Sequence, residues 1–172
     1  DNGYNIAMGH NAMQAATTAY YNICIGKDAG TAMAAAVPSC VVIGHEAGDA
    51  INHADAGGTI AIGRSAGGAI TSGAGNTAVG YQSLDALTES GQNTALGYGT
   101  LGTLIDGDQN TAVGYNAMTS GTHTSFNFNT VVGANAGDAF NATAAIEHVT
   151  VLGANADGGV LPADANGTVS LG

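Results

Sequence analysis

The sequence predicts an all-β fold, a parallel β-solenoid of about ten coils, from three observations. A short motif repeats at a fixed spacing, glycine accounts for 28 of the 172 residues, and charged residues make up only 9% of the chain. Glycine at this frequency argues against long helices, since each interior glycine costs about 1 kcal/mol relative to alanine. The repeat covers the whole chain, so we expect residues 1–172 to form a single domain without a linker.

The repeat is clearest in the middle of the chain. The segment Asn76-Thr-Ala-Val-Gly80-Tyr recurs from Asn93 and from Asn110, 17 residues apart each time. Weaker copies extend in both directions at spacings of 17 to 20 residues, which gives ten copies in all. The glycine of each copy is taken here as position 0. These glycines are Gly9, Gly26, Gly44, Gly63, Gly80, Gly97, Gly114, Gly133, Gly153 and Gly172.

The residues just before each glycine predict a short strand. Positions −3 and −1 are mostly aliphatic or β-branched, and position −2 is mostly small. Because alternate residues of a strand point to opposite faces, −3 and −1 share one face. We expect that face to fill the coil interior, while the small −2 residues contact another chain. The expected core residues are Ile6, Met8, Ile23, Ile25, Val41, Ile43, Ile60, Ile62, Val79, Leu96, Val113, Val132, Leu152 and Leu171.

The rest of each copy predicts a return path. Position +3 is small and position +7 is usually large and apolar, as in Ile51, Ile70 and Leu87. We expect these residues to re-enter the interior on a second short strand, before a polar turn such as residues 106–110 leads to the next coil. One coil cannot bury its apolar side alone, so stacking of coils supplies the burial.

A fixed register also stacks identical side chains on one another. Asn occupies position −4 in six copies, which predicts a ladder of amide hydrogen bonds, the alternative being a turn residue at each place. Tyr81, Tyr98 and Tyr115 occupy position +1 in consecutive coils and predict a ring stack, or a flat aromatic platform for a sugar. The ladder asparagines are Asn5, Asn22, Asn76, Asn93, Asn110 and Asn129.

The charge balance excludes several classes of protein. Thirteen acidic residues face only Lys27 and Arg64, for a formal net charge of −11. Two cations cannot form the basic footprint of a nucleic-acid binder. A disordered acidic tail would be poor in hydrophobic residues, which reach 45% here. No apolar run approaches the ~18 residues of a membrane span.

Motifs of enzymatic or cofactor chemistry are absent. The five histidines show no zinc-ligand spacing and no nucleophile motif is present, so we expect a protein that is not an enzyme and has no cofactor. Asp106 and Asp108 share one loop and could take up Ca²⁺, although solvated turn acids are the simpler interpretation. A polysaccharide-degrading solenoid would need paired carboxylates in a groove, and the sequence identifies no such pair.

The two cysteines leave two alternatives open. Cys24 and Cys40 lie in neighbouring coils, at positions −2 and −4. An even number of cysteines in an extracellular protein favours a disulfide. The two-residue offset places the Cα atoms ~8 Å apart, beyond the ~7 Å limit of a bridge, and favours two buried free thiols.

The motif Asn-Thr-Ala-Val-Gly-Tyr with a 17-residue period resembles the head repeats of YadA-like trimeric autotransporter adhesins and the related repeats of bacteriophage tail fibres. The likeness covers all ten copies and is strongest from Asn76 to Met118, although the coils here are longer than typical adhesin head repeats. The resemblance implies a left-handed β-roll, a homotrimer, and a place on a cell or virion surface. It carries over no receptor-binding residue.

We therefore expect an extracellular structural protein, a segment of a surface fibre, adhesin or phage tail fibre that self-assembles through strand stacking. Open strand edges at the ends of a solenoid invite pairing, so subunits are also expected to join end to end into a filament. The alternative is a carbohydrate- or receptor-binding module that uses Tyr81, Tyr98 and Tyr115. A polysaccharide-degrading enzyme is the weaker alternative.

Overall fold

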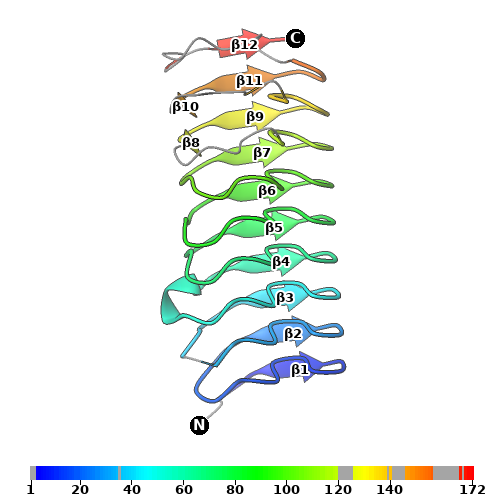
Figure 1. The fold of residues 1–172 in the computed structure, drawn as a ribbon, viewed down its shortest axis with the longest axis vertical. Coiled ribbons are helices and arrows are strands. Elements are labelled where there is room, and N and C mark those ends of the chain that lie inside the picture. Colours follow the sequence, from blue (N-terminus) through cyan, green and yellow to red (C-terminus); the bar gives the residue numbers. More distant parts are fainter. Residues whose placement is uncertain are drawn as a thin grey trace.

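The computed structural model describes residues 3–34, 36–119, 126–138, 140, 146–156, 167 and 169–172. One parallel sheet of ten strands runs through the molecule in the order β1-β2-β3-β4-β5-β6-β7-β9-β11-β12 (Figure 1). The predicted parallel β-solenoid is therefore confirmed. The strands are β1 (Ile6–Met8), β2 (Ile23–Ile25), β3 (Val41–Ile43), β4 (Ile60–Ile62), β5 (Thr77–Val79), β6 (Thr94–Leu96), β7 (Thr111–Val113), β9 (Thr130–Val132), β11 (Thr150–Leu152) and β12 (Val169–Leu171).

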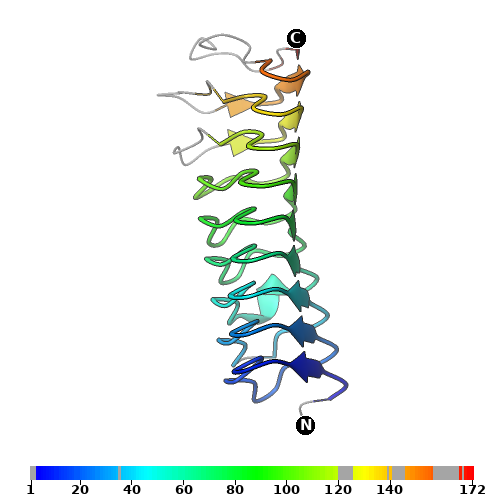
Figure 2. The same cartoon turned by 90° about the vertical axis from the view of Figure 1, so that its right-hand side faces the viewer.

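The register of the sheet follows the sequence repeat. Val79 pairs with Leu96, and Leu96 pairs with Val113, so equivalent residues lie one above another as predicted. The strands form one straight wall of the rod, and the return segments lie on its other side (Figure 2). Among the described residues no helix is long and apolar enough to cross a membrane.

The return path differs from the predicted second strand, which is wrong for positions +3 to +7. This segment is a series of turns because the backbone is left-handed at +2 and +4, as at Gln82 (φ 52°) and Leu84 (φ 50°). Stacked hydrogen bonds persist without a strand, since the Leu84 amide donates to the Thr100 carbonyl at 3.1 Å. The other short elements are β8 (Phe126–Asn127), which pairs in parallel with β10 (Ile146–Glu147), and a 3-10 helix at Ala54–Ala56.

The predicted assignment of the two strand faces is also wrong. The small −2 residues point into the coil, and the −3 and −1 residues point out: Ala95 is 0% exposed whereas Leu96 is 46% exposed. The large residues at +7 and, where +4 is Leu or Met, those at +4 already occupy the interior, so the inward strand position takes residues no larger than valine. The residues wrongly expected in the core, each exposed or half-buried on the outer face, are Ile6, Met8, Ile23, Ile25, Val41, Ile43, Ile60, Ile62, Val79, Leu96, Val113, Val132, Leu152 and Leu171.

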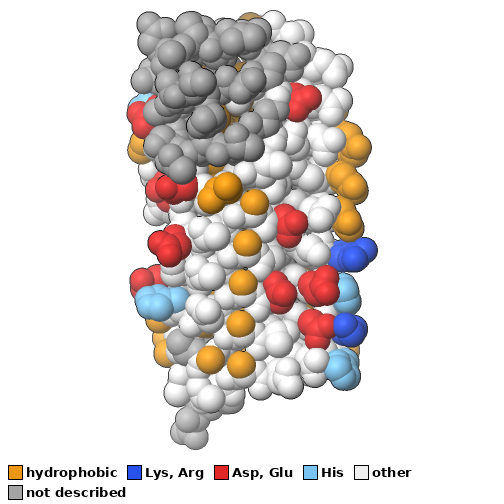
Figure 3. All heavy atoms as spheres, in the orientation of Figure 1, with side chains coloured by type: hydrophobic (Ala, Val, Ile, Leu, Met, Phe, Trp, Pro, Cys, Tyr) orange, Lys and Arg blue, Asp and Glu red, His pale blue; other side chains and the backbone are white. Residues whose placement is uncertain are grey.

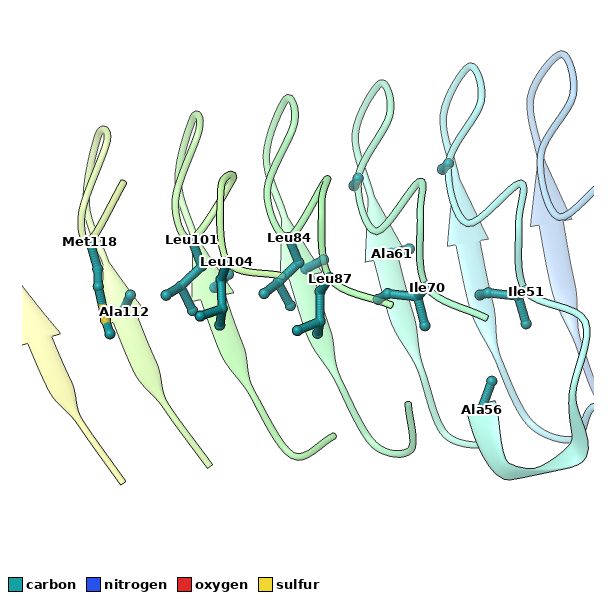
Figure 4. Close-up of a cluster of buried hydrophobic side chains, with 14 of the residues drawn as sticks. Ile51, Ala56, Ala61, Ile70, Leu84, Leu87, Leu101, Leu104, Ala112 and Met118 are labelled. Atoms are coloured by element: carbon teal, nitrogen blue, oxygen red, sulfur yellow. The ribbon is translucent and has the colours of Figure 1, made fainter. Parts of the chain in front are cut away.

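The interior is filled by positions −2, +3, +4 and +7, and the contribution of +4 was not predicted. Ala95, Leu101 and Leu104 fill one coil, at positions −2, +4 and +7, and all three are fully buried. Figure 4 shows Leu101 and Leu104 side by side in this interior. Where +4 is glycine, −2 can be larger, as in the coil of Val42, Gly48 and Ile51. A Cβ at Gly48 would lie 2.8 Å from Cδ1 of Ile51, so in this coil the glycine at +4 leaves room for Ile51 beside Val42.

The asparagine ladder at −4 is confirmed in both parts of the chain where asparagines follow one another. Asn93 is fully buried, and its Oδ1 accepts hydrogen bonds from Asn110 Nδ2 at 3.0 Å and from the Asn110 backbone amide at 2.9 Å. Its own Nδ2 donates to the Gly107 carbonyl at 2.7 Å. Asn22 bonds to Asn5 in the same way. Each amide therefore satisfies buried backbone groups that its three-residue strand leaves unpaired.

Candidate functional site

A row of side chains follows the strand ends along one edge of the rod. These position +1 residues, called here the lateral row, are His10, Lys27, His45, Arg64, Tyr81, Tyr98 and Tyr115. Within the row, the ring centroids of Tyr81 and Tyr98 lie 5.0 Å apart, and those of Tyr98 and Tyr115 lie 5.3 Å apart. The Arg64 guanidinium carbon lies 5.7 Å from the Tyr81 ring centroid, within cation–π range. The predicted ring stack is confirmed.

The stacking geometry limits which of the three tyrosines could offer a flat ring face to a sugar. The rings are nearly parallel, with interplanar angles of 13° and 18°, so Tyr98 has a neighbouring ring on each face. It presents its edge and hydroxyl to solvent rather than a flat face. Tyr115 is different, because the next residue of the register is Ala134, which carries no ring. One face of Tyr115 is therefore not covered by another lateral-row ring.

A surface pocket lies beside Tyr98. Its volume is about 420 Å³, and its lining residues are Gln82, Asp85, Tyr98, Gly99, Gly102, Thr103, Asn116 and Thr119. The pocket exists because Gly99 and Gly102 carry no side chain at positions +2 and +5, where the coil before has Gln82 and Asp85. The sequence indicates this pocket through two glycines in one coil, at positions where the preceding coil has polar residues. The pocket was not predicted.

The polar atoms around the pocket suit hydroxyl-rich ligands. Gln82 Nε2 donates to Asp85 Oδ2 at 3.3 Å, which orients both side chains. Burial, together with the negative charge of Glu46, raises the pKa of Asp85, while the hydrogen bond from Gln82 opposes the shift. Amide, hydroxyl and carboxylate groups next to an aromatic edge can donate to and accept from sugar hydroxyls. Asp85 is the one carboxylate among the residues that line this pocket, so it does not supply a pair for glycoside hydrolysis.

Asp49 approaches Asp85 across the coil between them. A Cβ at Gly68 would lie 3.0 Å from Oδ1 of Asp85 and 3.6 Å from Oδ1 of Asp49. Burial, followed by the charge of Glu46, raises the pKa of Asp49 as well. Glu46, Asp49 and Asp85 therefore make this edge of the rod strongly acidic, next to the basic and histidine side chains of the lateral row (Figure 3).

The two acids considered for calcium bond to neighbouring loops. Asp106 accepts a hydrogen bond from the Ser90 hydroxyl, and Asp108 Oδ1 accepts one from the Gly91 amide at 2.7 Å. Both contacts join consecutive coils, which gives Asp106 and Asp108 a structural role; calcium binding there stays a prediction. A different group of potential ligands, Asp28, His45 and Glu46, has its ligand atoms within 4.8 Å of one another, although the spacing of these residues in the sequence does not indicate a metal site.

Cys24 and Cys40 are free and buried, so the alternative of two thiols is confirmed and the disulfide is wrong. Cys24 pairs in register with Val42, not with Cys40, as the two-residue offset indicated. Burial, with a smaller contribution from Cys40, raises the pKa of the Cys24 thiol to about 12. Burial also raises the pKa of Cys40. Neither thiol is a reactive nucleophile in the folded protein.

Fold and surface together define a repeat protein of the parallel β-solenoid class, with an aromatic and charged row along one edge. Comparisons with protein-family models, with curated proteins and with solved structures find no match to the chain.

Proposed function

We propose that the chain is a segment of an extracellular structural fibre, of the kind found in surface adhesins and phage tail fibres, and that it assembles with copies of itself through the outer face of the sheet. The observation that carries this proposal is the row of apolar residues at −1 on that face, which is unbroken from Met8 to Leu171 and lies beside −3 residues that are aliphatic or threonine. Ile60 and Ile62 of β4, like their equivalents in the other strands, point away from the coil interior and remain partly exposed. A continuous, partly exposed apolar row of this kind is typical of an interaction site.

A second copy of the same chain fits this face best. The outer face consists of residues at −3 and −1, none of which is charged, although the chain has a net charge of −11. Its side chains repeat at the ~4.8 Å spacing of the strands, and an identical rod offers the same repeat in the same register. The resemblance to trimeric adhesins implies three copies and a location on a cell or virion surface, and both are part of the proposal.

A pair of aspartate substitutions tests the assembly. Ile62→Asp places a charge on the outer face, whereas Ala61→Asp places one in the closed interior, where Ala61 is fully buried. By analytical ultracentrifugation we expect wild type to sediment as an oligomer and Ile62→Asp as a folded monomer. Ala61→Asp should lose its β-type circular dichroism. A monomeric wild type, or an unchanged oligomer for Ile62→Asp, would contradict the proposal.

Filament formation is proposed as a second level of assembly. β1 and β12 are the edge strands of the ten-stranded sheet, and edge strands offer backbone groups for pairing with another chain. Electron micrographs of purified protein should show rods of variable length that lengthen with concentration. Discrete particles of one length would count against end-to-end joining.

The pocket beside Tyr98 favours a second candidate function, binding of a glycan at the fibre surface. Its combination of aromatic edge, amides, hydroxyls and one carboxylate supports this candidate. Gly99→Asn should fill the pocket without unfolding the coil, because Asn116 already occupies the same left-handed position in the next coil. A Cβ at Gly99 would lie 2.5 Å from Oδ1 of Asn116, the end of a flexible side chain that can move aside. On a glycan array we expect binding that Gly99→Asn and Tyr98→Ala both abolish. A fully retained signal in both variants would remove the candidate.

A further inference from the structure

Asp28, His45 and Glu46 lie on the turns that follow two neighbouring strands. Asp28 belongs to the turn after β2, and His45 and Glu46 belong to the turn after β3. The Glu46 amide donates to the Lys27 carbonyl at 3.0 Å, which keeps these turns in register. Asp28 and Glu46 therefore occupy the same position, +2, in consecutive coils, and their side chains run in one direction from the rod.

Two carboxylates in register repel each other across neighbouring coils. His45 Nδ1 lies 3.3 Å from Oε2 of Glu46, and one ligand atom from each of Asp28, His45 and Glu46 lies within 4.8 Å of the other two. A cation between them would relieve the repulsion. Since Glu46 also contributes, after burial, to the raised pKa of Asp49 and of Asp85, the surroundings carry further negative charge.

We propose that Asp28, His45 and Glu46 form a binding site for a divalent transition metal ion, represented by Zn²⁺. The donor set is one imidazole nitrogen and two carboxylate oxygens, which with water gives a complete shell for zinc. The imidazole selects for zinc over calcium, because calcium takes oxygen ligands. The ion would join the turns after β2 and β3 along the lateral row.

Lys27 competes for this site. Its ammonium donates to Asp28 Oδ2, while Asn11 Nδ2 donates to Asp28 Oδ1 at 2.9 Å. These contacts hold the Asp28 carboxylate in place on the side of the turn that faces Glu46 and His45. Exposed ion pairs of this kind are weak, and a metal ion can displace the ammonium at little cost. Removing Lys27 should therefore strengthen metal binding.

Isothermal titration of the full chain with ZnCl₂ tests the site. We expect one Zn²⁺ per chain, at least tenfold weaker binding in His45→Ala and in Glu46→Gln, and tighter binding in Lys27→Gln. His53→Ala is the matched control. His53 Nδ1 also lies close to one carboxylate, 3.2 Å from Oδ2 of Asp55. Among the described residues, however, His53 belongs to no group of three potential ligands. It should bind zinc as wild type does.

Three results would overturn the proposal. The first is that wild type binds zinc no more tightly than His45→Ala does. The second is that His53→Ala loses as much zinc affinity as His45→Ala. The third is titration with CaCl₂ that matches ZnCl₂, because an acidic surface without the imidazole would then account for the binding. Each variant replaces a side chain at the surface, so circular dichroism should show an unchanged fold throughout.

Discussion

At the scale of single residues, the glycine at position 0 is fixed by both backbone conformation and space. Gly80 has φ +134°, a conformation that side chains rarely adopt, and a Cβ there would lie 2.2 Å from the Gly97 carbonyl oxygen. The equivalent glycines of the other coils meet the next coil in the same way, at 2.2 to 2.7 Å for the coils from Gly9 to Gly153. The close approach of successive turns therefore requires the repeat of glycine.

Gly80→Ala should lower the free energy of unfolding by more than about 3 kcal/mol. An unfavourable backbone conformation alone costs about 1–3 kcal/mol, and the overlap of the new Cβ with a backbone carbonyl adds to this cost. Gly75→Ala is the matched control, because Gly75 also has positive φ, at +63°, but nothing lies within 4 Å of a Cβ there. It should cost about 1–2 kcal/mol. Urea denaturation followed by circular dichroism measures both, and equal losses would refute the role of the carbonyl contact.

Cys24 should make the stability depend on pH in the alkaline range. Burial raises the pKa of the thiol from its ordinary 9.0 to about 12, so the folded state holds the proton more strongly than the unfolded state does. The neutral thiol makes its full contribution to the free energy of unfolding below pH 9. This contribution is lost as the pH rises from about 9 to about 12. At pH 10 this loss is roughly 1 kcal/mol.

Cys24→Val should reduce that decline, because valine cannot ionise and Val42 already occupies the paired position in the next coil. Melting temperatures of wild type and variant, measured from pH 7 to pH 11, provide the comparison. Tyrosine and lysine titrations affect both proteins alike and cancel in the difference. Parallel curves for the two proteins would show that the Cys24 thiol does not determine the alkaline response.

At the scale of elements, the strands are only three residues long, and the buried asparagine ladder supplies further bonds between coils. Asn93→Ala would leave the Gly107 carbonyl and the Asn110 amide without their partners inside the protein. We expect a loss of about 2–4 kcal/mol by denaturant unfolding, from two unsatisfied buried groups. Asn135→Ala is the matched control, because the Asn135 side chain donates to Asn155 in an exposed contact, and its loss should cost less than about 1 kcal/mol.

The same scale shows how far the sequence alone could predict the structure. The period predicted the strands, their register, the asparagine ladder and the tyrosine stack, because each depends only on equivalent residues lying above one another. The alternation of residue types along each strand predicts two faces but does not show which face lies inside the coil, since Ile62 and Ala61 are both apolar. That choice depends on the interior volume, which the +7 residues fill from the opposite wall, together with large +4 residues such as Leu84.

The candidate sites were harder to predict for a related reason. The pocket beside Tyr98 depends on the absence of side chains at Gly99 and Gly102, two positions that the repeat motif does not single out. The group of Asp28, His45 and Glu46 depends on two neighbouring coils, and His45 considered within its own coil has no metal-ligand spacing. Both features arise between coils, where the register must be known before side chains can be placed together.

At the scale of the whole molecule, each described strand contacts only its neighbours in the sheet. The free energy of unfolding should therefore be close to a sum of contributions from single coils and from the interfaces between them. Removing one complete period should then leave a working solenoid. Deletion of residues 77–93 joins Asn76 to Thr94 and restores the motif from Asn76 through Thr94-Ala95-Leu96-Gly97. The coil of Ala61 would then stack on Ala95, Leu101 and Leu104, which match the deleted Ala78, Leu84 and Leu87 in type and position.

The shortened chain should keep its β-type circular dichroism and a cooperative melt, and small-angle scattering should show a rod shorter by about 4.8 Å. Deletion of residues 85–93 alone is the control, because about half a coil cannot complete the circuit and the strands on either side lose their register. That variant should unfold or aggregate. If the full-period deletion unfolds as readily as the half-period one, distant coils depend on each other and stability is not carried by neighbouring contacts.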